Sequence, residues 1–305
     1  MLNRLSLCVI YLLLFTATVS NAAVRKKSNH TLPPQVSLVV DYHTGKILHD
    51  NNSTTKIYPA SLTKLMTLYL LFEAVESGKL SMNQKLYVSK NATNMSPSKL
   101  GLKEKEFITV REAILALTVK SANDVAVVVA ENIKGTENKF SQLMNVRAIQ
   151  LGMKDTYFKN SSGWHHAMQK TTARDLVKLS IAIKRDFPQY YAFFSKNSFI
   201  FRGNIVRGHN KVTETYSGAE GLKTGYTAPS GFNLVTTATR KNKSLVAVVT
   251  GRKSAHSRDQ HMMKLLDTHF AQSENDKRAN TKLHKPQMMV ATNLKSNDKR
   301  KISRN

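Results

Sequence analysis

The sequence predicts an α+β fold in which a helical subdomain is inserted into a sheet subdomain, with a functional site in the cleft between them. Two observations support this prediction. Short runs rich in β-branched and aromatic residues lie towards both ends of the chain, at residues 36–49 and again from residue 199 to residue 250. Helical periodicity dominates residues 109–187 between them. Strands separated by a block of helices indicate two subdomains that share one chain.

Residues 1–22 are typical of an export signal. Arg4 supplies a positive start, residues 5–15 are apolar, and small residues around Ala22 suit a cleavage site. The apolar run is shorter than the roughly 20 residues that a spanning helix needs, so an uncleaved anchor is the second interpretation. Cys8 is the only cysteine and lies inside this segment, so the mature chain is expected to have neither disulfides nor thiol chemistry.

Residues 23–35, which contain Pro33 and Pro34, form a predicted linker, and a folded domain is expected over residues 36–271. The first elements that we predict are a strand at 36–41, a turn at 43–45, a returning strand at 46–49, a helix from about 60 to 77 and a short strand at 86–88.

The middle of the chain contains two sequence signals for helix starts. Thr109 with Glu112, and Thr172 with Asp175, each fit a capping box. The helices that we predict cover residues 109–119, 125–130, 137–151 and 172–187, with an interruption at 121–124. The strands that follow are expected at 199–201, 221–225, 232–239 and 245–250, before a final amphipathic helix at 257–270.

The formal net charge is +26, and residues 272–305 form a basic stretch with little periodicity that we expect to be disordered. Such a charge suits contact with an anionic membrane surface or wall polymer. Nucleic acid is not an expected partner, because the sequence lacks a basic strand studded with the aromatic residues that stack on bases.

Ser61 and Lys64 lie one helical turn apart at the start of the helix that follows Pro59, so both side chains share one face. A serine hydroxyl becomes a strong nucleophile when a base takes its proton, and a lysine can be that base if burial or a second cation lowers its pKa. The helix start adds N–H groups that suit a developing oxyanion. The spacing Ser-x-x-Lys recurs at three other places, so partners downstream are needed to single out Ser61.

Two such partners follow in order along the chain. They are Ser121-x-Asn123, at the predicted interruption between helices, and Lys223-Thr224-Gly225, on a predicted strand. The glycine lets a substrate backbone lie close to that strand, and the lysine and threonine suit a terminal carboxylate.

With these motifs the sequence resembles the serine D-Ala-D-Ala carboxypeptidases of bacteria, the low-molecular-mass penicillin-binding proteins of peptidase family S11. The resemblance covers residues 36 to about 270, including residues 58–60, 121–126, 172–175 and 221–227. It implies a β-lactamase/transpeptidase-like fold, an antiparallel sheet flanked by helices with an inserted all-helical subdomain, and export to the bacterial periplasm or cell envelope. It also implies removal of the terminal D-Ala from peptidoglycan stem pentapeptides, covalent inhibition by β-lactam antibiotics, and no metal or organic cofactor.

The resemblance assigns roles on the helical side of the cleft. Ser61 would attack the carbonyl between two D-alanines and form an acyl-enzyme, with Lys64 as its base. Ser121 would relay a proton to the leaving amine, and Asn123 would bind the peptide amide.

It assigns roles on the strand side as well. Lys223 would lower the pKa of Lys64 and, with Thr224, hold the substrate carboxylate beside Gly225. The backbone N–H groups of Tyr226 and of the nucleophile would form the oxyanion hole. Arg258, 35 residues beyond Lys223, is expected to make a second carboxylate contact, with Arg252 as the alternative.

Three other functions fit parts of this sequence. A class A β-lactamase needs a glutamate in the loop downstream of its Ser-Asp-Asn, and no glutamate occurs between Glu137 and Glu214. A D,D-endopeptidase that cuts peptidoglycan cross-links with the same motifs remains open. A non-catalytic wall-binding protein would have no use for an activated serine. His165 and His166 lack the further ligands of a zinc peptidase, so we interpret them as loop residues beside a rim or packed aromatic residue, Trp164.

Overall fold

The computed structural model describes residues 33–283, with side chains described up to residue 271. The predicted export signal, nearly all of the predicted linker and residues 284–305 lie outside the described residues. Within residues 33–283 no helix combines the length and the apolar character needed to cross a bilayer.

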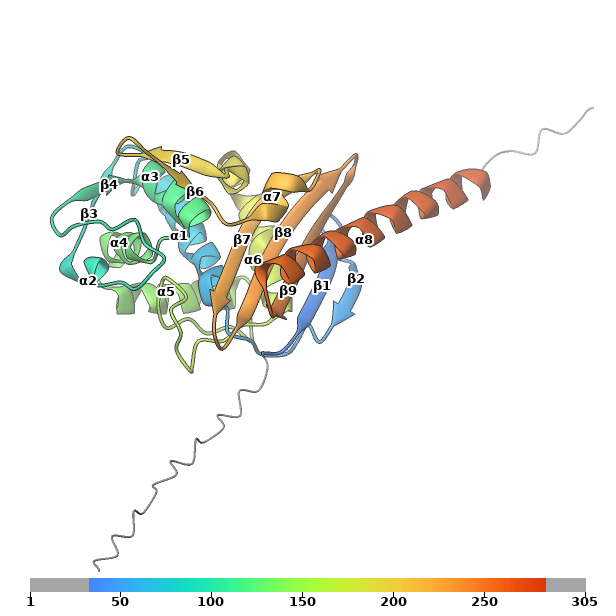
Figure 1. Ribbon diagram of the computed structural model, residues 1–305, viewed down its shortest axis with the longest axis horizontal. Helices are drawn as coiled ribbons and strands as arrows, with labels where there is room; N and C mark the ends of the chain where they lie inside the picture. The colour runs from blue at the N-terminus through green and yellow to red at the C-terminus, as the bar shows by residue number, and fades with distance from the viewer. Residues whose placement is uncertain (1–32, 284–305) are drawn as a thin grey trace, which may run out of the picture. The chain divides into compact units, whose positions relative to one another are not determined.

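A five-stranded antiparallel sheet in the order β2-β1-β9-β8-β7 forms the centre of the fold (Figure 1). Its strands are β1 (Val36–Asp41), β2 (Ile47–Asn51), β7 (Ala219–Thr227), β8 (Gly231–Arg240) and β9 (Lys243–Arg252). Because β1 pairs with β9, the first and second β regions of the sequence join in one sheet. Strand β7 stands at an edge, so a cleft can form along its outer side.

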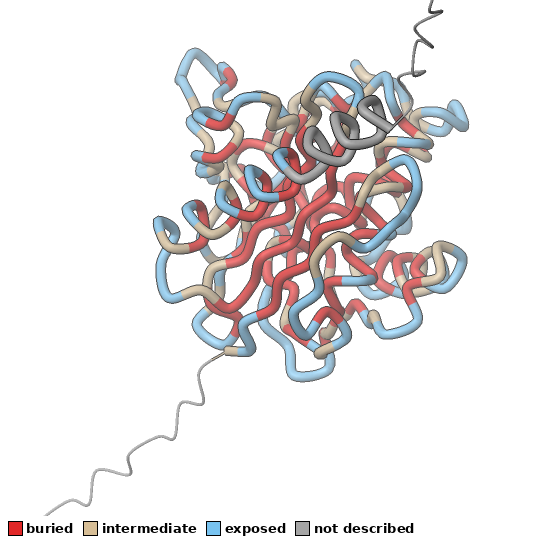
Figure 2. The backbone as a smooth tube through the Cα atoms, turned by 90° about the vertical axis from the view of Figure 1, so that its right-hand side faces the viewer, coloured by how far each residue is buried: buried red, intermediate tan, exposed pale blue. Residues whose placement is uncertain are grey.

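Helices pack against both faces of this sheet, and its central strands are coloured as buried in Figure 2. On one face α8 (Ala255–Leu283) packs Met262 and Leu266 against sheet residues such as Leu234 and Val249. The other face lies against α1 (Lys64–Glu76) and α6 (Ala173–Asp186) in the larger apolar core. Strands β8 and β9 are therefore buried along most of their length, as expected for strands covered on both sides.

The chain between β2 and β7 forms the inserted subdomain and the elements that connect it to the sheet. Its remaining elements are η1 (Ala60–Thr63), β3 (Lys85–Tyr87), α2 (Lys90–Thr93), β4 (Phe107–Thr109), α3 (Val110–Leu115), η2 (Ala116–Lys120), α4 (Asn123–Lys134), α5 (Glu137–Gln150), η3 (Pro188–Ser195), β5 (Ser198–Phe201), β6 (Asn204–Arg207) and α7 (Lys211–Thr215). The predicted α+β arrangement is confirmed, but the insertion is not entirely helical, because β3 and β4 pair as a small antiparallel ribbon.

The two predicted capping boxes have different outcomes. Thr109 and Glu112 exchange both capping hydrogen bonds at the start of α3. At the start of α6 the Thr172 hydroxyl accepts from the Asp175 N–H, whereas the Asp175 carboxylate accepts from the Asp155 N–H. Aspartate is one methylene shorter than the glutamate of a full capping box, so we attribute the half-formed box to its shorter reach.

The last helix is longer than predicted. It begins at Ala255 and ends at Leu283, so residues 272–283 of the predicted disordered tail are helical. The amphipathic pattern that marked its end stops at Phe270, yet no glycine or proline interrupts the sequence before Leu283. Loss of the apolar stripe is therefore not the signal that ends this helix.

Candidate active site

Ser61 lies in η1, a single turn of 3-10 helix that precedes α1, rather than in the first turn of an α-helix as predicted. The turn begins at Ala60, whose φ of 48° is unusual for a residue with a side chain. Lys64 is the first residue of α1, and its Nζ lies 3.0 Å from Ser61 Oγ. The spacing expected from the sequence is thus present, although a tighter helix produces it.

Lys64 is completely buried, and its amine contacts three oxygens. Nζ donates to Asn123 Oδ1 at 2.7 Å and to the backbone carbonyl of Ser162. These two oxygens can only accept, so they use two N–H groups of the lysine. In a neutral amine the remaining position is a lone pair, which can accept the hydroxyl hydrogen of Ser61.

The surroundings favour that neutral amine. Burial is the main cause that lowers the pKa of Lys64 well below its usual value, and the nearby Lys223 cation lowers it further. The carboxylates of Asp124 and Glu137 act in the opposite direction but weigh less. Both carboxylates accept hydrogen bonds elsewhere, Asp124 from backbone N–H groups of residues 100–102 and Glu137 from Ser161.

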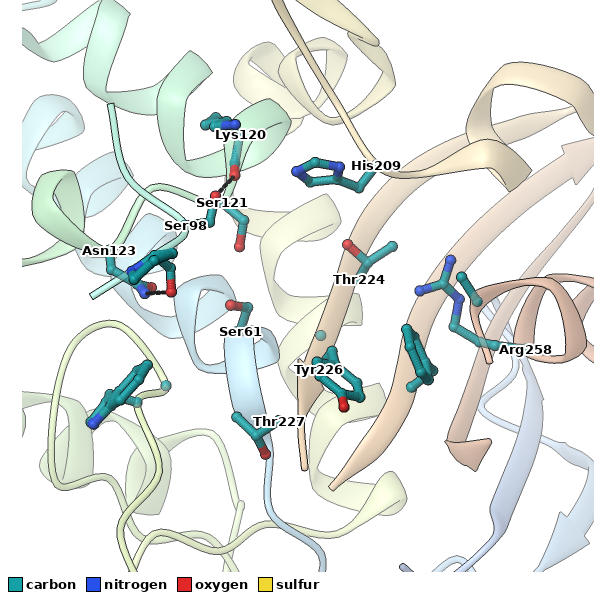
Figure 3. A pocket seen from close by; sticks show the side chains of 16 residues that line it. Ser61, Ser98, Lys120, Ser121, Asn123, His209, Thr224, Tyr226, Thr227 and Arg258 are labelled. Atoms are coloured by element: carbon teal, nitrogen blue, oxygen red, sulfur yellow. Dashed lines mark hydrogen bonds between the residues drawn. The ribbon is translucent and has the colours of Figure 1, made fainter. Parts of the chain in front are cut away.

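Ser121 lies between η2 and α4, where its left-handed φ of 62° ends η2. Its hydroxyl is buried and has no hydrogen-bond partner among the described residues. Figure 3 shows this side chain pointing towards the space in front of Ser61. A buried hydroxyl without a partner is costly, so this one is suited to a partner that arrives with the substrate.

Asn123 is placed differently from the implied substrate contact. Its Oδ1 accepts from Lys64, and its Nδ2 donates to the backbone carbonyls of Ser96 and Pro97 at 3.0 and 3.1 Å. The side-chain amide therefore connects Lys64 to the loop between α2 and β4, and both of its N–H groups are used within the protein. Nothing local in the sequence indicates which side chain the Pro97 carbonyl contacts.

The other wall of the cleft is β7. Lys223 is 2% exposed, and its Nζ donates to the carbonyl of Thr224 at 3.1 Å. Burial, and secondly the Arg258 cation, lower the pKa of Lys223 to about 7. A Cβ on Gly225 would lie 3.2 Å from the carbonyl oxygen of Pro59, so glycine lets β7 approach η1 closely.

The structure separates the two candidate arginines. Arg258, near the start of α8, is 3% exposed, contacts Asp259 at 2.8 Å and lines the same cavity as Ser61. Arg252 donates to Gln35 Oε1 and lines a different, smaller cavity. Only Arg258 is therefore placed to reach a carboxylate held beside Thr224.

A cavity of about 620 Å³ is lined by the motif residues Ser61, Ser121, Asn123, Thr224, Gly225, Tyr226 and Arg258. The buried Lys64 and Lys223 are not among its lining residues. In Figure 3 Ser61 lies between Ser121 and Asn123 on the helical side and Thr224 and Tyr226 on the strand side. Other lining residues that the sequence did not identify as site residues are Ser98, Lys120, Gly163, His209, Thr227, Phe232 and Ala255. Thr227 ends the stretch 221–227 that carries the resemblance, whereas the other six lie outside the quoted stretches and are brought here by tertiary structure.

The loop that contains Trp164 closes the cavity on one side. A Cβ on Gly163 would lie 1.8 Å from the carbonyl oxygen of Ala60, so the loop rests directly on the backbone next to the nucleophile. Trp164 is 48% exposed at the rim. His165 and His166 do not line the cavity, and within residues 33–283 no group of three or more His, Cys, Asp or Glu side chains is arranged to hold a metal ion.

A serine in contact with a buried lysine, in a cleft between a helical subdomain and the edge of an antiparallel sheet, defines a serine hydrolase of the transpeptidase-like fold. The D-alanyl-D-alanine carboxypeptidase family model matches residues 23–254. The chain belongs to this family.

Three relatives illustrate the relationship. The D-alanyl-D-alanine carboxypeptidase DacF of Bacillus subtilis is 32% identical over 243 residues, which are 78% of this chain and 62% of that protein. Penicillin binding protein 5 from Haemophilus influenzae has a solved structure with a TM-score of 0.75 and 32% identity, covering 79% of this chain and 72% of that one. The D-alanyl-D-alanine endopeptidase of Pseudomonas aeruginosa is 29% identical, over 85% of this chain and 86% of that protein. The chain thus spans less than two thirds of the length of DacF.

Proposed function

We propose that the protein is an exported serine D,D-carboxypeptidase that removes the terminal D-Ala from peptidoglycan stem pentapeptides. The observation that carries this proposal is the contact between Ser61 Oγ and the buried amine of Lys64, opposite the cationic strand β7. Membership of the family and the names of its relatives support the choice of substrate.

In the acylation step, Lys64 Nζ takes the hydroxyl proton as Ser61 Oγ bonds to the carbonyl carbon of the penultimate D-Ala. The backbone N–H groups of Ser61 and Tyr226 stabilise the oxyanion, a contribution of about 3 kcal/mol for a single such donor. The C–N bond then breaks, and Ser121 passes a proton to the amine of the departing D-Ala. Water attacks the ester in the second step, and Ser61 regains its proton.

Binding groups determine which end of the peptide enters. Lys223, Thr224 and Arg258 hold the terminal carboxylate, and Gly225 lets the peptide backbone lie beside β7. Asn123 acts as a positioning residue for Lys64. A β-lactam presents a carboxylate and a reactive carbonyl with similar spacing, so it acylates Ser61 and leaves slowly.

A second candidate function is a D,D-endopeptidase that cleaves the cross-link between two stem peptides. The observation in its favour is the similarity to the D-alanyl-D-alanine endopeptidase of Pseudomonas aeruginosa, which is 29% identical over 85% of this chain. In either case we propose the cell envelope as the location, with the net charge of +26 suited to anionic wall polymers or lipid headgroups.

Labelling with a fluorescent penicillin tests the nucleophile. The wild-type protein should become covalently labelled, and Ser61→Ala should lose the label entirely. Ser77→Ala, at the far end of α1, is the matched control and should label like the wild type. Equal labelling of a folded Ser61→Ala variant would disprove the assignment.

Mass spectrometry of digested muropeptides separates the two activities. Loss of one alanine from a pentapeptide supports the carboxypeptidase. Cleavage of a cross-linked dimer alone, with the pentapeptide unchanged, would favour the endopeptidase.

A further inference from the structure

A second, smaller cavity of about 240 Å³ lies next to the catalytic one. Tyr226 and Phe232 line both cavities, and their rings are 4.3 Å apart, so this aromatic pair forms the wall between them. The remaining lining residues come from the first described residues, the β7–β8 turn and the end of β9, and they are Pro33, Gln35, Ala228, Gly231, Gly251, Arg252 and Lys253. Nothing in the proposed reaction uses this cavity.

The charge of the cavity is positive. Arg252 and Lys253 both line it, and none of its lining residues carries a carboxylate. The guanidinium of Arg252 donates from Nη1 to Gln35 Oε1 at 2.8 Å. This neutral partner orients the guanidinium without compensating its charge, so the cation remains available to an anion.

The direction in which a substrate peptide lies along β7 places its N-terminal part near this cavity. The terminal carboxylate is assigned to Lys223, Thr224 and Arg258, and a peptide added antiparallel to the edge strand β7 runs with its N-terminal part towards Thr227. The residue that precedes D-Ala-D-Ala therefore lies beside Tyr226. A long side chain at that position can pass the aromatic ring and reach Arg252.

We propose that this cavity, on the strength of the proposed function, is a specificity subsite that binds a side-chain carboxylate on the residue preceding D-Ala-D-Ala. Arg252 and Lys253 bind the anion, while Tyr226 and Phe232 contact the aliphatic part of the same side chain. The preferred substrates are thus acidic stem peptides, and amidation of that carboxylate weakens them.

The test uses two isosteric peptides, acetyl-Glu-D-Ala-D-Ala and acetyl-Gln-D-Ala-D-Ala, with D-Ala release as the readout. The wild-type protein should favour the glutamate peptide by roughly tenfold in kcat/KM, as for a charge-assisted hydrogen bond. Arg252→Gln/Lys253→Gln should reduce this preference to less than about twofold by slowing the glutamate peptide alone.

Two controls keep the result specific. Lys46→Gln/Lys79→Gln removes two exposed charges distant in the sequence from the lining segments and should keep the preference. Benzylpenicillin has no such side-chain carboxylate, so it should acylate the Arg252→Gln/Lys253→Gln variant at the wild-type rate, which also shows that the variant folds.

The outcomes are distinguishable. Equal rates for both peptides in the wild type would overturn the subsite and leave the proposed carboxypeptidase intact. A preference that survives in Arg252→Gln/Lys253→Gln would also overturn it. Absence of D-Ala release from both peptides would overturn the proposed function, and the subsite with it.

Discussion

Buried or partly buried lysines near the two ends of β7 have opposite kinds of hydrogen-bond partner. At the end far from the cleft, Lys184 Nζ donates to the carboxylate of Glu220 and to Ser244 Oγ, and it lies 5.1 Å from the ring centre of Tyr42. At the cleft end, the hydrogen-bond partners of Lys64 and Lys223 among the described residues are carbonyl, amide or hydroxyl oxygens.

The difference in partners distinguishes a structural lysine from lysines suited to acid–base chemistry. A carboxylate partner balances the charge of Lys184, as in a structural ion pair. Without such a partner, burial lowers the pKa of Lys64 and brings the pKa of Lys223 to about 7. Groups whose pKa is displaced in a cleft are candidates for acid–base chemistry, and their burial costs stability that an ion pair would have recovered.

The largest expected effect comes from removing the cleft lysine. Lys64→Met should lower the rate of acylation by a fluorescent penicillin about 10²- to 10⁴-fold, the range that a general base contributes. Lys184→Met should change that rate by less than about threefold but lower the free energy of unfolding by roughly 1–2 kcal/mol, because Glu220 loses its partner.

Stopped-flow acylation and thermal unfolding measure the two quantities on the same samples. A Lys64→Met variant that acylates normally would remove the basis of the contrast. A folded Lys184→Met variant that is acylated as slowly as Lys64→Met would also remove the basis of the contrast.

A second change gives the cleft lysine the carboxylate that it lacks. In Asn123→Asp an anion replaces the amide oxygen that accepts from Lys64, which favours the ammonium form and raises the pKa of Lys64. The base is then neutral only at higher pH. Acylation at pH 7 should fall roughly 10- to 100-fold, and the acidic limb of the pH profile of kcat/KM should move upward by at least about one unit.

Asn123→Ser is the matched control, because it removes the amide without adding charge. Its acidic limb should stay within about half a unit of the wild type. An unchanged limb in Asn123→Asp would show that Lys64 does not titrate as the base.

The smallest effect is a pH dependence of the unmodified protein. Lys223, with a pKa of about 7, is charged below that pH and neutral above it. For a peptide that ends in a carboxylate, kcat/KM should therefore decrease up to about tenfold per pH unit above pH 7. A peptide with a terminal carboxamide should lack this basic limb, and initial rates of D-Ala or D-alaninamide release between pH 6 and 9 measure both. Identical pH profiles for the two peptides would show that Lys223 does not bind the terminal carboxylate.

Local patterns account for what the sequence could predict. The three motifs combine residue types whose chemistry is evident, and strong periodicity located α5, α6 and the strands of the sheet to within a few residues. Spacing alone also anticipated the meeting of Ser61 with Lys64, because a 3-10 turn and an α turn both bring residues three apart to one side.

The features of the site that the sequence did not predict depend on contacts between distant segments. The Nδ2 group of Asn123 donates to backbone carbonyls, which have no sequence signature. Lys120 and His209 line the cavity only because η2 and the chain before α7 meet there. Partial burial and the cations Lys120, Lys223 and Arg258 lower the pKa of His209, an arrangement that no periodic pattern indicates. The helical part of the predicted tail was missed because amphipathic patterning reports burial rather than helix length.

The position of Gly163 limits how this protein can change under selection by antibiotics. Since any added side chain there would collide with the carbonyl of Ala60, a substitution at residue 163 has to displace the backbone next to Ser61, the proposed nucleophile. Under the proposed function, changes in the response to β-lactams that preserve D,D-peptidase activity are therefore expected at rim positions such as Trp164, and libraries that diversify this loop should keep residue 163 constant.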